Sequence, residues 1–243
     1  METTRVGVQV LVTAHNSEKY LQESLNSILP AVANRPWVFI FHDDGSTDST
    51  FDIAYAFSKT CGADAVIIKR SDKHKSVGSA KNATFKLIDA FRKKYPWICV
   101  HDSDDLMYPT RVEGLLEVAE EENCKFVHGD YYCYTRDFKG RVFCLRQIQL
   151  LGFGIWATLF HESLVPESGE FFRTDLTVFE DYAKWWDMRY VDEIDIIPAQ
   201  GVMTTHYIKR DTSMTYKVTQ EQIDKLKAIR AKVFNHPLFK IST

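Results

Sequence analysis

The chain has 243 residues, of which 45% are apolar and 26% are charged, and its formal net charge is −3. These values are ordinary for a soluble globular protein, and the length fits either one α/β domain or two fused lobes. The slight negative charge argues against a nucleic-acid-binding protein, which usually carries a basic face.

The first half of the chain alternates predicted strands with predicted helices. Apolar, β-branched runs indicate the strands, and apolar residues at helical spacing indicate the helices. The strands span 6–12, 37–41, 65–68 and 97–100; the helices span 17–29, 79–94 and 110–122, and another begins near 49. Asn16 or Ser17 is expected to cap the first helix, while Ser49 and Thr110 open predicted capping boxes. Such repeated units predict an α/β fold, with a mostly parallel sheet covered by helices on both faces.

The second half is less regular. Strands are predicted at 125–134 and 141–149, joined by a turn at 137–140, and again at 194–197 and 202–208. Helices are predicted at 180–190 and after a capping box at 219–222. The chain contains no internal repeat, low-complexity stretch or proline-rich linker. We therefore expect one compact domain.

Acidic residues gather at the ends of two predicted strands. Asp102, Asp104 and Asp105 follow the strand at 97–100, and Asp43 and Asp44 follow the strand at 37–41. In parallel sheets, ligands bind beyond the carboxyl ends of the strands. Side chains alternate along a strand, so Asp102 and Asp104 are expected to point the same way and to favour a cation between them. Carboxylate oxygens suit Mg²⁺ or Mn²⁺, which complete their coordination with phosphate oxygens and water.

Each acidic cluster also has a purely structural interpretation. The Asp-Gly pair at 44–45 favours a turn, Asp48 or Ser49 can cap the next helix, and residues 102–105 can form a solvated turn. In the functional interpretation, one carboxylate of the 43–48 cluster accepts the imino proton of a pyrimidine ring. The other motifs of the sequence distinguish between the structural and the functional interpretation.

Several motifs, in order, resemble glycosyltransferase family 2. They are Val-Thr-Ala-His-Asn at 12–16, Asp-Asp-Gly-Ser-Thr-Asp at 43–48, Val-Gly-Ser-Ala-Lys-Asn at 77–82, Asp-Ser-Asp-Asp at 102–105 and Phe-Glu-Asp-Tyr at 179–182. The resemblance extends over about residues 6–215. It implies a GT-A fold in one domain over 1–243, with a nucleotide-sugar-binding half at about 1–105 and an acceptor-binding half at about 106–243.

The resemblance implies roles for individual residues. Thr13 and His15 would line the nucleobase and ribose pocket, Asp44 would bond the base, and Asp102 would contact the ribose or the metal. The full nucleotide-binding set would be Thr13, Ala14, His15, Asn16, Asp44, Gly78, Lys81, Asp102 and Ser103. Asp104 is the first candidate metal ligand, followed by Asp102, Asp105 and His206, for an Mn²⁺ or Mg²⁺ ion that stabilises the leaving diphosphate.

The same resemblance implies an inverting reaction with a carboxylate base. Asp181 would take the proton of the acceptor hydroxyl as its oxygen attacks the anomeric carbon, and Glu180 is the alternative base. Taken alone, the Glu-Asp pair could simply be favourable acidic charge in the first turn of a helix.

Some positions depart from the family pattern or have structural alternatives. Lys81 stands where the family usually has arginine, and it keeps the charge but loses the bidentate geometry. In the late segment at 207–213, Ile208 and Arg210 replace the family's arginine and histidine, and a role for Lys209 or Arg210 near the diphosphate is open. His206 could be a structural histidine. The basic run at 69–75 could be a solvated face, and Trp156, His161, Tyr182, Trp185 and Trp186 could be core residues or could border an acceptor pocket.

Two other functions compete with this one. A sugar nucleotidyltransferase normally has a glycine-rich loop with arginine and lysine after its first strand, where this chain has residues 13–16. A non-catalytic nucleotide-sugar-binding or glycan-binding module would keep the fold but lose the metal aspartates or the base, and all of these are present. The chain lacks the glycine motifs of dinucleotide-dependent oxidoreductases and of phosphate-loop ATPases.

Partners and location follow from the same features. We expect a nucleoside-diphosphate-sugar donor, with UDP favoured because Asp44 suits a pyrimidine imide, and a glycan, lipid or protein-linked acceptor. The five cysteines are scattered and suggest reduced thiols, and no signal peptide or membrane-spanning run is evident. We expect a cytoplasmic protein that could contact a membrane only peripherally and that binds no nucleic acid.

Overall fold

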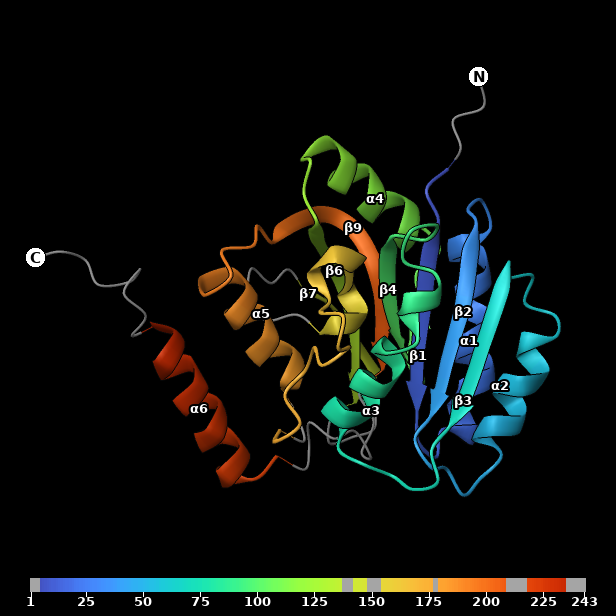
Figure 1. Cartoon of the computed structure of the whole chain (residues 1–243), viewed down its shortest axis with the longest axis horizontal. Helices are drawn as coiled ribbons and strands as arrows, with labels where there is room; N and C mark the ends of the chain where they lie inside the picture. The colour runs from blue at the N-terminus through green and yellow to red at the C-terminus, as the bar shows by residue number, and fades with distance from the viewer. Residues whose placement is uncertain (1–4, 137–141, 148–153, 177–178, 209–217, 235–243) are drawn as a thin grey trace, which may run out of the picture.

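The computed structural model describes residues 5–136, 142–147, 154–176, 179–208 and 218–234. One nine-stranded sheet runs through it in the order β3-β2-β1-β4-β8-β6-β9-β5, with β7 paired to β6 (Figure 1). The strands are β1 (Val8–Ala14), β2 (Trp37–Asp43), β3 (Ala65–Arg70), β4 (Trp97–Asp102), β5 (Leu106–Met107), β6 (Phe126–Arg136), β7 (Val142–Gln147), β8 (Thr158–His161) and β9 (Ile197–Ile208).

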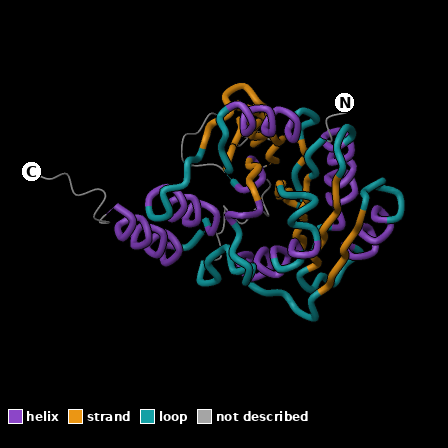
Figure 2. The backbone as a smooth tube through the Cα atoms, turned by 45° about the horizontal axis from the view of Figure 1, so that its top comes forward, coloured by secondary structure: helices purple, strands orange, loops and turns teal. Residues whose placement is uncertain are grey.

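Six α-helices and three short 3₁₀ turns accompany the described part of the sheet. They are α1 (Glu18–Val32), α2 (Thr50–Ser58), α3 (Val77–Phe85), α4 (Arg111–Glu121), α5 (Glu180–Tyr190), α6 (Gln220–Phe234), η1 (Ile88–Ala90), η2 (Ile155–Ala157) and η3 (Glu162–Leu164). Helices lie on both sides of the strands (Figure 2). The predicted α/β fold is confirmed. β3, β2, β1 and β4 run parallel, as do β6 and β9, whereas β5, β7 and β8 pair antiparallel.

Alternating side chains of the central strands fill two separate cores. On β1, Val8, Val10 and Val12 pack into the core beneath α1, α2 and α4, whereas Leu11 packs into the core beneath α3 and α5. β2 and β4 alternate in the same way. Successive side chains of a strand point to opposite faces, so a strand buried on both faces is apolar along its whole length. This explains the continuous apolar runs in the sequence.

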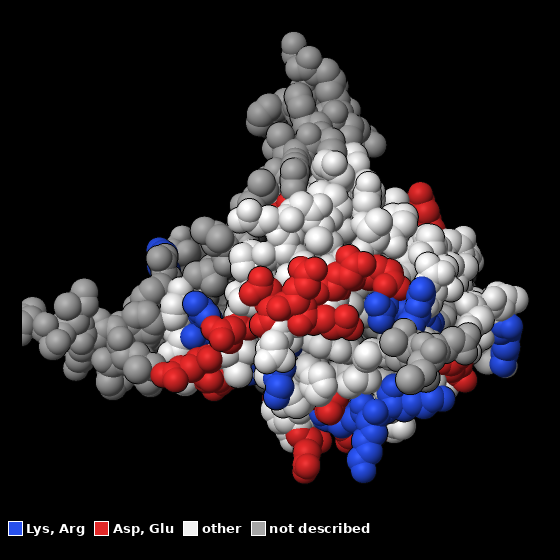
Figure 3. All heavy atoms as spheres, turned by 90° about the horizontal axis from the view of Figure 1, so that it is seen from above, with Lys and Arg blue, Asp and Glu red and all other residues white. Residues whose placement is uncertain are grey.

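Helix α4 is amphipathic, and its outer face carries acidic side chains. Val112, Leu115 and Leu116 are buried in the core, whereas Glu117 and Glu120 are exposed. An acidic band crosses the face of the molecule that is seen from above (Figure 3). At the other side of the molecule, α6 packs against α5 through a small apolar cluster that includes Ile229 and Ala183.

The length predicted for the helix at 79–94 is wrong, because the observed helix is shorter. It begins at Val77 and ends at Phe85, and turns then lead to Pro96. Long-range contacts hold this segment out of a helix. Arg92 donates hydrogen bonds to the carbonyls of Glu162 and Val165, and the Tyr95 hydroxyl donates to Asp64. Local helical spacing carries no information about such distant partners.

The strands of the second half also differ from the prediction. The two strands predicted at 194–197 and 202–208 form one strand, β9, whose pairing with β6 shifts register beside Gly129 and Asp130. Gly201 has a φ of 87°, and its N–H donates to Asp130, so the irregularity stays within the strand. The short strand β8 was not predicted. The turn predicted at 137–140 lies outside the described residues.

Only one of the three predicted capping boxes forms its side-chain bond. Thr219 accepts a hydrogen bond from the N–H of Gln222 at the start of α6. Ser49 and Thr110 are N-cap residues without a side-chain cap bond, and Asp48 instead accepts from the N–H of Thr50. Ser17 is the N-cap residue of α1, also without a side-chain cap bond.

Two expectations from composition can be compared with the described residues. Cys61, Cys99, Cys124 and Cys133 carry free thiols. None of the described helices is both long and apolar enough to span a bilayer.

Candidate active site

The predicted site residues of the first half meet at the carboxyl ends of three neighbouring strands. β1 lies between β2 and β4, and the register places Thr13 beside Asp102 on one side and Ala14 beside Asp43 on the other. The backbone N–H of Asp44 donates to the Ala14 carbonyl at 2.8 Å. Both acidic clusters therefore flank the end of β1, as expected for a ligand site of a parallel sheet.

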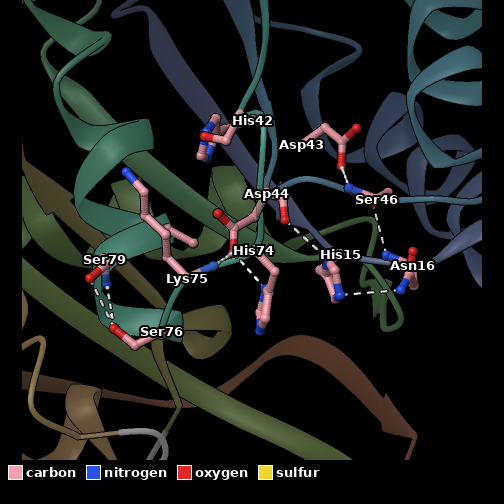
Figure 4. Close-up of polar contacts among 12 residues, drawn as sticks. His15, Asn16, His42, Asp43, Asp44, Ser46, His74, Lys75, Ser76 and Ser79 are labelled. Atoms are coloured by element: carbon pink, nitrogen blue, oxygen red, sulfur yellow. Dashed lines mark hydrogen bonds and ion pairs between the residues drawn. The ribbon is translucent and has the colours of Figure 1, made fainter.

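The Asp44 carboxylate is held firmly within this edge. The residue is only 1% exposed. Its Oδ2 accepts from the Nδ1 of His74 at 2.7 Å and from the backbone N–H of Lys75 at 2.9 Å, whereas Oδ1 is buried without a hydrogen-bond partner (Figure 4). A buried carboxylate oxygen without a donor is unfavourable. The carboxylate is therefore oriented by the protein but retains unused acceptor capacity.

His15 and Asn16, at the end of β1, lie beside Asp44. The Nδ1 of His15 lies 2.9 Å from the carbonyl oxygen of Asp44, which can only accept, so Nδ1 is the donor; Nε2 then accepts from the Asn16 side chain at 3.1 Å. Asn16 has a φ of 48°, and its side-chain oxygen accepts from the N–H of Thr47. The His15 ring stacks on the ring of His74, with centroids 3.9 Å apart. These contacts position the His15 ring.

Asp43, unlike Asp44, has bonds that are typical of a structural residue. One oxygen accepts from the N–H of Ser46, and the other lies 3.1 Å from the Nε of Arg70. Gly45 follows Asp44 directly and has a φ of 71°. A Cβ at this position would collide with the backbone of Lys73 and His74. Glycine at this position therefore lets the loop at 71–76 close over Asp44.

Two predicted nucleotide-binding hydroxyls are paired within the protein. The Thr13 hydroxyl lies 2.7 Å from the Thr84 hydroxyl, and the Ser103 hydroxyl lies 2.8 Å from the Ser17 hydroxyl. These bonds join β1 to α3 and the 102–105 turn to the start of α1. Their roles in nucleotide binding stay predictions.

The acidic run after β4 alternates in burial. Asp102 and Asp104 are partly buried, whereas Ser103 and Asp105 are buried. Asp105 accepts from the backbone N–H of Ile208 at 2.9 Å, which ties this turn to β9. The Asp102 carboxylate has no hydrogen-bond partner among the described residues. Burial raises its pKa, while Lys81 opposes that shift.

Lys81 connects this acidic run to the start of α5. Its Nζ donates to Glu180 at 2.7 Å, and both side chains are buried. Burial works to lower the pKa of the Lys81 ammonium, but Glu180, Asp102 and Asp181 together raise it above its ordinary value. The predicted residues from the two halves of the chain are thus brought into one electrostatic unit.

Two neighbours of Lys81 on α3 position this helix. A Cβ on Gly78 would collide with the carbonyl of Arg173, so glycine allows close approach of the two backbones. The Asn82 side chain makes four hydrogen bonds to residues 170–172. It accepts from the N–H groups of Phe171 and Phe172 and donates to Glu170 and to the Phe172 carbonyl. Gly78 and Asn82 therefore align Lys81 with Glu180.

Asp181 is a buried carboxylate at the start of α5. It accepts from its neighbour, the N–H of Tyr182, at 2.8 Å and from the N–H of Ile155 at 3.1 Å. Burial, reinforced by Glu180 and opposed by Lys81, raises the pKa of Asp181 to about 7. Before it, Phe179 has a φ of 63°, a left-handed conformation that is unfavourable for a bulky residue and is often found at functional sites.

The aromatic residues near α5 divide into core and site residues. Trp185 is fully buried in the core, and Trp186 packs against the α5–α6 cluster. His161 pairs with Trp97 at the start of β4, the opposite end from Asp102, so it does not border the site. Trp156 follows Ile155 and stacks on Tyr207 with centroids 5.1 Å apart. Trp156 follows Ile155 and Tyr182 follows Asp181, so both of these aromatic residues adjoin the Asp181 contacts in the sequence.

His206 lies next to the acidic run but is engaged with tyrosines. It pairs with Leu106 across β5 and β9, and its Nδ1 lies 2.8 Å from the Tyr134 hydroxyl. Its ring stacks on Tyr132, and burial lowers its pKa. The described residues contain no group of three or more His, Cys, Asp or Glu side chains placed to hold a metal ion. The metal role of His206 stays a prediction, and Lys209 and Arg210 lie outside the described residues.

Sequence reasoning missed two residues of this region. His74 was read only as part of a basic run, yet it covers Asp44. Arg111 was read as part of a capping box, yet it is fully buried and donates through Nη2 to the carbonyls of Val100 and Thr158. Burial lowers its pKa, which the nearby Cys99, Asp102 and Asp105 oppose. An arginine within an otherwise apolar helix face was the only sequence signal for Arg111.

Comparison with known proteins identifies what this architecture resembles. The model of the family described as glycosyl transferase family 2 matches residues 9–236. The chain is 26% identical over 150 residues to Glycosyltransferase GlyG of Streptococcus pneumoniae serotype 4, covering 59% of this chain and 47% of that protein. It is 25% identical over 130 residues to the putative teichuronic acid biosynthesis glycosyltransferase TuaG of Bacillus subtilis, covering 54% and 48%. The chain spans about half the length of these curated relatives.

Solved structures share the fold at low sequence identity. Residues 1–349 of S. aureus TarS in complex with UDP-GlcNAc superpose with a TM-score of 0.72 at 16% identity, covering 95% of this chain and 67% of that chain. The mannosyltransferase PcManGT from Pyrobaculum calidifontis, in complex with GDP-Man and Mn²⁺, gives a TM-score of 0.60 at 16% identity, covering 96% and 63%.

Proposed function

The chain belongs to glycosyltransferase family 2 and has a GT-A fold, and we propose that it transfers one sugar from a nucleoside-diphosphate sugar to an acceptor hydroxyl with inversion. The observation that carries this proposal is the interaction of Lys81 with Asp102 and with the Glu180–Asp181 pair. Asp102 stands at the end of β4, and Asp181 lies 79 residues later on α5, yet both act electrostatically on Lys81. This arrangement supports a donor site and a base that lie on either side of Lys81.

Asp181 is the proposed base because its geometry and its pKa suit the task. Two backbone N–H groups orient its carboxylate and leave further lone pairs for an acceptor hydroxyl. A pKa near neutral pH lets the carboxylate accept a proton during attack. As the acceptor oxygen bonds to the anomeric carbon, its proton passes to Asp181 and the bond from that carbon to the phosphate oxygen breaks on the opposite face. This single displacement inverts the configuration.

The donor is proposed to bind along the ends of β1, β2 and β4. Asp44 is oriented by the protein and accepts a ring N–H from the base, which favours uracil, and His15 lies beside it. TarS, a protein of the same fold, was solved with UDP-GlcNAc. This likeness in fold supports a UDP-sugar donor. The acceptor, whether glycan, lipid-linked or protein-linked, would enter beside Asp181 and Trp156.

Asp102 and Asp104 fit a divalent cation. They alternate with buried neighbours along the turn, and the Asp102 carboxylate lacks a hydrogen-bond partner among the described residues, so a hard cation would satisfy it. Because three protein ligands do not converge in the described chain, diphosphate oxygens and water would complete the coordination. A bound Mn²⁺ or Mg²⁺ would stabilise negative charge on the leaving diphosphate.

Donor hydrolysis and transfer test this proposal. The protein is incubated with UDP-, GDP- and dTDP-sugars in the presence of Mn²⁺, Mg²⁺ or EDTA, with and without a panel of acceptor glycans, and free nucleoside diphosphate is measured. We expect release from one donor that EDTA and Asp104→Ala abolish, while Asp52→Ala, an exposed aspartate on α2, has no effect. Donor binding without release under any condition would instead favour a non-catalytic binding module. Absence of any nucleotide binding would contradict the donor site itself.

A further inference from the structure

One side chain of this protein already contacts both His15 and Asp44, the two residues proposed to lie against the nucleobase. The imidazole of His74 stacks on His15, with ring centroids 3.9 Å apart and planes inclined by 24°. Its Nδ1 also lies 2.7 Å from Oδ2 of Asp44. His15, Asp44 and His74 lie together in Figure 4. A uracil ring could likewise stack on His15 and direct its ring N–H at Asp44. His74 therefore lies where a base would bind.

Both carboxylate oxygens of Asp44 are covered in this structure. Oδ1 is buried, and Oδ2 already accepts from His74 and from the N–H of Lys75. Neither oxygen can receive a ring N–H from a ligand until some covering group moves. The His74 side chain is 52% exposed, whereas the Asp44 side chain is 1% exposed. Of the groups that cover Asp44, the His74 side chain is the one that can rotate into the adjacent solvent.

The backbone of this loop is held in place, which restricts the movement to one side chain. Gly45 packs so closely against Lys73 and His74 that a Cβ would collide with them. The N–H of Lys75 bonds Asp44 independently of the His74 ring. When the ring rotates away, the Lys75 N–H still orients the carboxylate, and one acceptor position on Oδ2 becomes available.

We propose that His74 is a displaceable placeholder for the nucleobase: its ring occupies the base position in the free protein and must turn away when the donor binds. This inference rests on the proposed function, because it takes the His15–Asp44 edge as the base site. It also narrows the donor class. The incoming ring must bring its own N–H to replace that of His74, which uracil, thymine and guanine have and neutral cytosine and adenine lack.

Nucleotide affinity measured by calorimetry tests the proposal. We expect His74→Ala to bind UDP in the presence of Mn²⁺ about tenfold more tightly than the wild-type chain, since the base no longer has to break a hydrogen bond to a buried carboxylate. Lys73→Ala is the matched control, because it removes an exposed basic side chain from the same loop. It should leave UDP affinity unchanged or weaken it. Loss of a basic side chain near an anionic ligand would by itself weaken binding. A gain in UDP affinity in His74→Ala therefore indicates that the base displaces the His74 ring, because an effect of charge would have the opposite sign.

A ligand without a base provides the second arm. Pyrophosphate with Mn²⁺ should bind the wild-type chain and His74→Ala equally, because it does not compete with the ring. If His74→Ala binds UDP no more tightly than the wild-type chain, or gains equally for pyrophosphate, the placeholder is wrong. If UDP, GDP and dTDP bind neither protein, the proposed function is wrong as well, so the two failures are distinguishable.

A measurement on the unaltered protein guards against a variant that misfolds. In NMR spectra of the free wild-type chain, ring protons of His15 and His74 should show a mutual Overhauser contact, as expected for rings 3.9 Å apart. Saturating UDP should abolish this contact. A contact that persists with UDP bound would overturn the proposal.

Discussion

Lys81 on α3 donates a 2.7 Å hydrogen bond to Glu180 on α5, and both side chains are almost completely buried. The two residues are 99 positions apart in the sequence. Their ion pair joins the side of the candidate site formed by α3 to the side that carries Asp181. A buried pair of this kind is costly to break from one side, because the remaining charge is left without a partner.

The first prediction concerns this pair. Lys81→Gln should lower the free energy of unfolding by about 3 kcal/mol or more, because Glu180 becomes an uncompensated buried charge. Lys86→Gln, which breaks the exposed pair of Lys86 with Glu170, should cost less than about 1 kcal/mol. Urea denaturation of the three proteins at neutral pH measures both. Equal losses in the two variants would show that the buried pair is not special.

The second prediction concerns the proposed base. Asp181→Asn keeps the shape of the side chain but cannot take a proton, so kcat should fall by about 100-fold to 10,000-fold. Affinity for UDP should change little, since Asp181 is proposed to contact the acceptor and not the donor nucleotide. Asp187→Asn, six residues further along the same helix, is the matched control and should retain activity. Retained turnover in Asp181→Asn would assign the base elsewhere, with Glu180 as the next candidate.

The third prediction is a pH profile. Burial raises the pKa of Asp181 to about 7, and only the ionised form is a base, so kcat/KM should fall about tenfold per pH unit below neutral. Glu180 contributes to that raised pKa, so in Glu180→Gln the fall should begin at a lower pH. Initial rates between pH 5 and 9 with saturating metal measure both profiles. An identical midpoint in the two proteins would contradict the coupling.

Stability has the opposite pH trend at this residue. The pKa of Asp181 in the folded protein is raised from the ordinary value of 3.8 to about 7, so the folded state binds a proton more tightly than the unfolded state. The stability that this proton contributes is fully present below about pH 4 and is lost as the pH rises toward about 7. Asp181→Asn should therefore gain stability relative to the wild-type chain as pH increases from about 4 to about 7. Denaturant midpoints over this range measure the difference.

The fourth prediction concerns the support of α3. Asn82→Asp replaces the amide that donates to the Phe172 carbonyl and to Glu170, and it places a carboxylate beside both. The loss should be about 2 kcal/mol or more of unfolding free energy, because a buried carbonyl loses its donor. Asn26→Asp, on the exposed face of α1 with one bond from Gln22, should be nearly neutral. Thermal melting of both variants measures the contrast.

Much of this site could be predicted from the sequence because its elements are local. Alternating or continuous apolar runs predicted β1, β2 and β4, and acidic residues directly after two of these strands had to lie at the carboxyl edge of the sheet. The helix α5 was predicted with its observed bounds, and Asp181 with it. These inferences depend on the periods of strands and helices, which neighbouring residues determine by themselves.

Only the tertiary structure decided which of these side chains interact. The early end of α3 depends on contacts between Arg92 and residues 162–166, and the continuity of β9 depends on its pairing with β6. Likewise, nothing in the spacing of residues 69–75 indicates that His74 covers Asp44, or that Lys81 reaches Glu180. Sequence patterns report periodicity and composition, whereas these contacts depend on how segments separated by tens of residues pack, and on which buried charges and hydrogen-bonding groups must then be satisfied.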